Sequence, residues 1–120
     1  MPNPVIFFEV VGCDGPALRH FYASLFGWKI SEVPAPMDYG MVAREDAGIE
    51  GGIGASPNGG QGHTTFYVQS DDPAGTLARA ENLGARRLLA PTELPGGGVI
   101  ALLADPEGHP VGLYKPARGG

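Results

Sequence analysis

The chain has 120 residues, of which 42% are hydrophobic and 18% charged, and its formal net charge is −5. These values are typical of one globular domain, residues 1–120, and no apolar run reaches the roughly 20 residues that cross a bilayer. The acidic balance argues against nucleic acid or membrane as a partner, and the absence of a signal-peptide pattern leads us to expect a cytoplasmic protein.

Strand and helix patterns alternate along the whole chain, and glycine and proline separate them. In the first half we expect strands at 5–11, 28–33, 39–44 and 48–55, a helix from Pro16 to Gly27, and a turn at Glu45 and Asp46. After a link at 57–62, we expect strands at 63–69, 87–90, 99–104 and 111–115 and a helix from Pro73 to Gly84. The prediction is therefore eight strands and two helices.

The first predicted helix has a clear apolar pattern. Leu18, Phe21, Tyr22 and Leu25 follow the i, i+3, i+4, i+7 spacing of a single helical face. We therefore expect these four side chains to pack together against a sheet.

The two halves of the chain resemble each other at a separation of 57 residues. This spacing places Asp14 on Asp71 and Pro16 on Pro73 at the two predicted helix starts. Two copies of one unit can bury a sheet face that neither copy buries alone. The repeat predicts an α+β fold of two βαβββ modules, about 4–56 and 63–116, which face each other across a cleft.

Three segments carry a family resemblance over almost the whole chain. They are FFEVVGCDGPALRHFYASLFGWKI, HTTFYVQSDDPAGTLARAENLGAR and LADPEGHPVGLYKP. Together they resemble the vicinal oxygen chelate superfamily, which includes glyoxalase I, extradiol dioxygenases, methylmalonyl-CoA epimerase and bleomycin-binding proteins. The resemblance implies a curved eight-stranded sheet around the cleft, and a homodimer.

Catalytic members of this superfamily hold a divalent ion with His or Glu side chains on particular strands. By resemblance, these ligand positions fall on Phe7, His63 and Gly112, and an additional position falls near Glu50. Neither phenylalanine nor glycine has a side chain that binds a metal ion. We therefore expect no metal cofactor, and the alternative is a divalent-metal site that uses His63 and Glu50.

Strand alternation predicts which side chains line the cleft. If position 7 faces the cleft, Glu9 does also, while Phe8 and Val10 face the helix. The full set of expected ligand-binding residues is Phe7, Glu9, Trp28, Met41, Glu50, His63, Thr65, Tyr67, Gly112 and Tyr114. Such a pocket is mostly apolar, with one imidazole and one or two carboxylates.

Glu9 and His63 are the candidate catalytic residues. A carboxylate in an apolar strand is either solvated in an open cleft or paired with a cation, for which Arg44, Arg86 and Arg87 are the candidates. His63 also has a structural interpretation, in which it begins a strand and bonds to neighbouring backbone.

Two functions remain open on this basis. The first is a metal-free protein that binds an apolar or aromatic small molecule in the cleft. The second is a lyase or isomerase with Glu9 and His63 as acid and base, or a metalloenzyme with Glu50 and His63 as ligands. The sequence leaves open the identity of the ligand and whether it is turned over.

Overall fold

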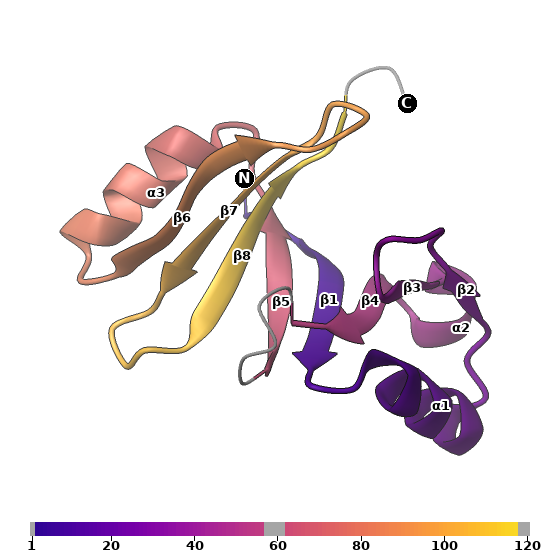
Figure 1. Cartoon of the computed structure of the whole chain (residues 1–120). Coiled ribbons are helices and arrows are strands. Elements are labelled where there is room, and N and C mark those ends of the chain that lie inside the picture. The colour runs from indigo at the N-terminus through magenta and orange to yellow at the C-terminus, as the bar shows by residue number, and fades with distance from the viewer. Residues whose placement is uncertain (1, 57–61, 118–120) are drawn as a thin grey trace. The chain divides into compact units, whose positions relative to one another are not determined.

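The computed structural model describes residues 2–56 and 62–117, which contain eight strands and three helices (Figure 1). Except for Gly62, the expected link at 57–62 lies outside the described residues. No helix in these two ranges has both the length and the apolar character that crossing a membrane requires. The α+β class and the two βαβββ modules are confirmed.

The first module forms a four-stranded sheet with two helices. Its elements are β1 (Val5–Gly12), α1 (Gly15–Phe26), β2 (Ile30–Glu32), β3 (Tyr39–Val42), α2 (Arg44–Ala47) and β4 (Glu50–Ala55). The strand order is β2-β3-β4-β1, in which β4 runs parallel to β1 and antiparallel to β3.

The second module repeats this order with a single helix. Its elements are β5 (His63–Gln69), α3 (Pro73–Asn82), β6 (Arg86–Glu93), β7 (Val99–Ala104) and β8 (Pro110–Lys115). The strand order is β5-β8-β7-β6, and β8 runs parallel to β5. Figure 1 shows α3 lying along the sheet that β6, β7 and β8 form.

The described residues divide into two compact units that nearly follow the modules. The first unit comprises residues 7–56 and 62–65, and the second comprises residues 2–6 and 66–117. The N-terminal segment belongs to the second unit because it bonds to the end of β5. The backbone N–H of Gln69 donates to the Pro4 carbonyl at 2.9 Å, and the Asn3 amide donates to the Gln69 carbonyl at 2.8 Å.

Aspartate caps start the long helix of each module. The Asp14 carboxylate accepts the Ala17 backbone N–H at 3.0 Å, and the Asp72 carboxylate accepts the Gly75 backbone N–H at 3.1 Å. The equivalent caps are therefore Asp14 and Asp72, and the predicted match of Asp14 with Asp71 is wrong by one residue. Gly15 is the additional residue in the first module, since it lies between the cap and the helical proline there.

The helix α2 was not expected. Its four residues were predicted as the end of a strand and a turn at Glu45 and Asp46. The Asp46 carboxylate accepts the backbone N–H of Lys29 at 2.9 Å, so this short helix is tied to the segment that leads into β2.

Each unit has its own hydrophobic core beneath its long helix. The fully buried residues are Val42 and Ile53 in the first unit and Leu77 and Ala101 in the second. In the first unit Phe8 and Val10 belong to this helix-covered core, as strand alternation predicts. Burial of each large aliphatic side chain stabilises the fold by roughly 1.5–3 kcal/mol.

The predicted apolar stripe of α1 is wrong in part. Leu18 and Tyr22 pack against the core, but Phe21 is 55% exposed and Leu25 is 59% exposed. The inward position beside Leu18 and Tyr22 is instead occupied by Arg19, which is only 7% exposed.

The contacts of Arg19 explain this orientation of α1. Its guanidinium lies 2.8 Å from an Asp38 carboxylate oxygen and donates to the Ile53 carbonyl at 3.2 Å. Its aliphatic stem fits over Gly40, where an added Cβ would lie 2.6 Å from the Arg19 Cδ atom. The guanidinium thus satisfies the buried Ile53 carbonyl and pairs with Asp38, and the helix turns Phe21 and Leu25 outward.

Candidate functional site

The first unit presents a face of its sheet opposite α1, and this face collects several of the expected site residues. The register pairs Phe7 with Glu50 across β1 and β4, and it pairs Glu9 with Gly52. Gly52 is in turn paired with Met41 on β3. Because side chains alternate along a strand, Phe7, Glu9, Glu50 and Met41 share the face that Phe8 and Val10 do not. Glu50 is exposed, whereas the other three are half-buried.

Glu9 is held by a phenol. The Tyr39 hydroxyl donates to a Glu9 carboxylate oxygen at 2.7 Å. Only arginines were expected as partners of Glu9, so Tyr39 is an unpredicted partner. The available signal was alternation, since Tyr39 is two residues before Met41 on the same strand face.

Gly52 makes this contact possible. A Cβ atom at Gly52 would overlap the end of the Tyr39 ring, including its hydroxyl. The missing side chain therefore leaves the space that the Tyr39 ring fills on its way to Glu9. The result is a fixed carboxylate–phenol pair on a largely apolar face.

Trp28 lies elsewhere. Its ring stacks on Tyr22 with centroids 6.0 Å apart and an interplanar angle of 9°, and its centroid is 5.5 Å from that of Phe8. Since Tyr22 and Phe8 are on the helix-covered side of the sheet, Trp28 does not join Glu9 and Met41 on the opposite face. The structure therefore places Trp28 apart from the other expected residues of this unit, and its part in ligand binding stays a prediction.

His63 and Thr65 are on the part of β5 that belongs to the first unit. Thr65 is 4% exposed. His63 is half-buried, and its Nε2 atom is enclosed without a hydrogen-bond partner among the described residues. A buried ring nitrogen in this state is costly until a water molecule or a ligand bonds to it.

The second unit brings together the remaining expected residues. Tyr67 on β5 is paired with Gly112 on β8, and Tyr114 is paired with Gln69. Leu113 points to the core beneath α3, so Gly112 and Tyr114 face the other side of the sheet. A Cβ atom at Gly112 would overlap the Tyr67 ring, which therefore lies directly over this glycine.

This packing tests whether the residues fit a divalent ion. At Gly112, where metal-binding relatives carry a ligand by resemblance, the space for a side chain is filled by the Tyr67 ring. Within residues 2–56 and 62–117, no group of three or more His, Cys, Asp and Glu side chains is placed to hold a metal ion. The residues at these positions do not fit a metal centre.

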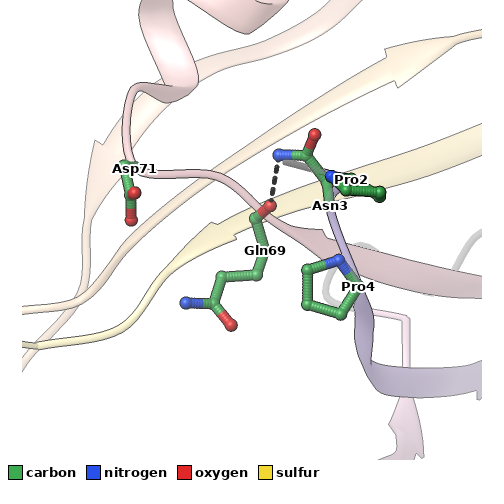
Figure 2. Close-up of a pocket in the computed structure, with 5 residues that line it drawn as sticks. All are labelled: Pro2, Asn3, Pro4, Gln69 and Asp71. Carbon is green, nitrogen blue, oxygen red and sulfur yellow. Dashed lines mark hydrogen bonds between the residues drawn. The ribbon is translucent and has the colours of Figure 1, made fainter.

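A small polar hollow of about 230 Å³ opens on the second unit (Figure 2). It is lined by Pro2, Asn3, Pro4, Gln69 and Asp71. This hollow was not expected from the sequence, because it depends on the bonding of the N-terminal segment to Gln69. Its lining of amides, a carboxylate and proline rings differs from the mostly apolar pocket that was expected to bind the ligand.

The chain is similar to known proteins over most of its length. A family model described as "Glyoxalase-like domain" matches residues 10–114. CFP32 of Mycobacterium tuberculosis, whose name assigns it provisionally to the glyoxylases, is 30% identical over 99 residues, which cover 81% of this chain and 38% of CFP32. The anthracycline biosynthesis protein DnrV of Streptomyces peucetius is 26% identical over an alignment of 130 residues, gaps included, which spans 95% of this chain and 47% of DnrV.

These two relatives are much longer than the matched region, and the chain spans less than half of each. Among solved structures, a glyoxalase/bleomycin resistance protein/dioxygenase superfamily member from Vibrio splendidus is similar with a TM-score of 0.67 and 12% identity. The similarity covers 96% of this chain and all of that one, which supports the fold assignment.

Proposed function

Because the chain belongs to the glyoxalase-like domain family, we propose that it is a binding module that holds an apolar, aromatic small molecule without a metal ion. The observation that carries this proposal is the Tyr67 ring seated over Gly112. An aromatic surface stands where relatives that hold a metal would place a ligand side chain. Phe7 on β1 is likewise an aromatic residue at a position where the resemblance implies a metal ligand.

The helix-free face of the first unit supports an aromatic ligand. Phe7 and Met41 offer apolar surface, and Met adapts its shape to flat rings. The Glu9–Tyr39 pair adds one fixed polar group, with the two oxygens 2.7 Å apart. Binding sites for small molecules combine apolar walls with a few placed polar groups in this way.

The similarity to DnrV supports the chemical class of the ligand. That protein is named for anthracycline biosynthesis, and anthracyclines contain a fused, hydroxylated ring system. We infer that the ligand of this chain is a polycyclic aromatic molecule with hydroxyl or carbonyl groups. The Glu9 carboxylate would accept a hydrogen bond from such a hydroxyl group.

Equilibrium dialysis with a hydroxyanthraquinone tests this proposal. Protein treated with EDTA should bind the probe at one saturable site, and added zinc, nickel, manganese or iron should leave the affinity unchanged. Met41→Asp should weaken binding by about tenfold, because a charge on the apolar face must be desolvated. Met37→Asp is the matched control, since Met37 is 59% exposed and lies in the loop before β3.

Two results would contradict the proposal. One is the absence of saturable binding in folded protein, which circular dichroism would establish. The other is binding that appears only after a divalent metal is restored.

A second candidate function is supported by His63. Its enclosed Nε2 atom, without a partner among the described residues, is suited to exchange a proton with a bound molecule. In that case Glu9 would act as a base next to a carbonyl group. Incubation of 2-tetralone with the protein in D2O would reveal it as deuterium incorporation that Glu9→Gln abolishes and Met37→Asp does not.

A further inference from the structure

The polar hollow of Figure 2 is formed by the second unit alone, where the N-terminal segment meets the end of β5. We call it the N-terminal hollow and define it by its five lining residues, which are Pro2, Asn3, Pro4, Gln69 and Asp71. None of the five is among the residues expected to bind an aromatic ligand. What this hollow binds is therefore a question separate from the proposed function.

Two hydrogen bonds fix the N-terminal wall of the hollow. The Gln69 backbone N–H donates to the Pro4 carbonyl at 2.9 Å, and the Asn3 side-chain amide donates to the Gln69 carbonyl at 2.8 Å. The proline rings at positions 2 and 4 also restrict the backbone on both sides of Asn3, because each ring fixes its own φ angle. The wall is therefore in place before a ligand arrives, which reduces the entropy lost on binding.

Asp71 is held between two anchored residues. Ser70 is 2% exposed, and its hydroxyl oxygen lies 2.8 Å from that of Thr76. Asp72 caps α3 through its carboxylate. Because Asp72 already serves the start of the helix, the carboxylate of Asp71 is left to the hollow.

The polar side chains of the hollow offer mainly hydrogen-bond acceptors. Asp71 has two carboxylate oxygens, and within residues 2–56 and 62–117 its side chain has neither an ion pair nor a hydrogen bond. Figure 2 accordingly shows a bond from Asn3 to Gln69 and none to Asp71. No lysine, arginine or histidine is among the five lining residues. A ligand that complements this hollow must therefore supply both N–H donors and positive charge.

A guanidinium group matches these acceptors. It is planar, and two of its N–H groups can bond to both oxygens of one carboxylate. It is also more weakly hydrated than an ammonium group, so less free energy is lost when it is brought against the proline rings. The hollow of about 230 Å³ is smaller than the roughly 300–1,000 Å³ of sites for drug-sized ligands, so it has room for one such group and a short alkyl stem.

We propose that the N-terminal hollow binds the guanidinium group of a small organic cation. Asp71 pairs with the guanidinium through two hydrogen bonds, and the side-chain oxygen of Gln69 accepts a further N–H. The rings of Pro2 and Pro4 contact the alkyl stem. Because Asp71 is exposed, the complex is weak and sensitive to salt.

A titration with butylguanidinium, followed by heteronuclear NMR at low ionic strength, tests the site. The amide signals of Asn3, Gln69 and Asp71 should shift together and saturate at millimolar probe. Asp71→Asn should weaken binding at least tenfold, because it keeps the size of the side chain and removes its charge. Glu93→Gln is the matched control and should bind as the unaltered chain does. It removes the same charge from an exposed carboxylate of β6, which is three strands away from β5 in the sheet order.

A second probe separates hydrogen bonding from charge alone. Tetramethylammonium has the same charge as butylguanidinium but no N–H group, so it should bind at least tenfold more weakly. Gln69→Ala should weaken butylguanidinium binding about fivefold, the effect of one hydrogen bond, and it leaves both backbone bonds of the N-terminal wall intact. Circular dichroism and melting temperature establish that each variant folds.

Three results would overturn the proposal. The first is the absence of saturable shifts at the hollow in folded, unaltered protein. The second is equal affinity for tetramethylammonium, which would indicate a counterion held by charge alone. The third is an equal effect of Asp71→Asn and Glu93→Gln, which would indicate that the probe responds to the net charge of the protein.

Discussion

The long helices of the two modules begin alike and pack differently. Both start at an aspartate cap followed by proline, yet α1 buries Arg19 and exposes Phe21, while α3 buries Leu77 and exposes Arg79. The start of a helix is thus set by local chemistry, which the repeat preserves. The rotation of a helix about its axis is set by the residues of the sheet beneath it. In the first unit Gly40 leaves space for the Arg19 stem, and Asp38 pairs with the Arg19 guanidinium.

The largest expected effect on stability comes from comparing a buried leucine of α3 with an exposed leucine of α1. Leu77→Ala should destabilise the protein by about 2–5 kcal/mol, because Leu77 is fully buried and its removal leaves a cavity. Leu25→Ala should change the free energy of unfolding by less than about 0.5 kcal/mol, because Leu25 is 59% exposed. Urea denaturation measures both, and equal losses would contradict the assigned orientation of α1.

For the arginines, substitution should destabilise the protein more in α1 than in α3. Arg19→Met should cost about 2–3 kcal/mol, because the Ile53 carbonyl and the Asp38 carboxylate lose a charged donor. Arg79→Met is the control and should be nearly neutral, since Arg79 is exposed. Thermal unfolding of the two variants side by side is sufficient, and a neutral Arg19→Met would show that the cation is dispensable.

A smaller effect is expected on the helix-free face of the first unit. Tyr39→Phe should destabilise the protein by about 1 kcal/mol, because Glu9 loses the hydroxyl that donates to it at 2.7 Å. Tyr114→Phe removes the same atom from a half-buried tyrosine of the second unit and is the control. Chemical denaturation at neutral pH compares them, and a Tyr39→Phe variant as stable as the unaltered chain would argue against a pre-formed pair.

The smallest expected effect concerns the turns between the last two strands of each module, β3 and β4 in the first and β7 and β8 in the second. In the second module this turn holds Asp105, whose carboxylate accepts the His109 and Glu107 backbone N–H groups at 2.9 Å each. The His109 N–H bond, foremost, holds the pKa of Asp105 below its ordinary value of 3.8. A lowered folded-state pKa gives stability that is present above the unfolded-state pKa and lost as pH falls through the folded-state pKa.

The melting temperature should therefore decline below about pH 4, and Asp105→Asn should lose part of that acid dependence. Asp46→Asn in α2 is the comparison in the first module. A scan of melting temperature from about pH 6 to about pH 2.5 measures it. If the melting temperature of Asp105→Asn falls in acid as much as that of the unaltered chain, other carboxylates dominate the acid dependence.

Much of the fold was predictable because its signals are local. Asp14 and Asp72 mark the helix starts, and Gly27 ends α1 in the left-handed conformation, with φ of 74°, that glycine adopts freely. Helix α2 was missed because four residues are too few to show a helical period. The rotation of α1 was missed because it depends on Gly40, which is distant in sequence from Arg19.

The candidate site was predictable to the same extent. Alternation along β1 predicted that Phe7 and Glu9 share the face opposite Phe8 and Val10, because the period of a strand is fixed. The partner of Glu9 was not predictable from composition, since Tyr39 reaches it only through the register of β1, β4 and β3. Trp28 lies apart from these residues because it follows the helix and precedes β2, where no strand period applies.

The Tyr67 ring over Gly112 also constrains how such a protein can change over evolution. A single mutation that adds an acidic side chain at position 112 would overlap the Tyr67 ring and should destabilise the fold. Position 67 must first become small, and that step alone leaves a void. A side chain at position 112 and a small residue at position 67 would therefore have to be introduced together.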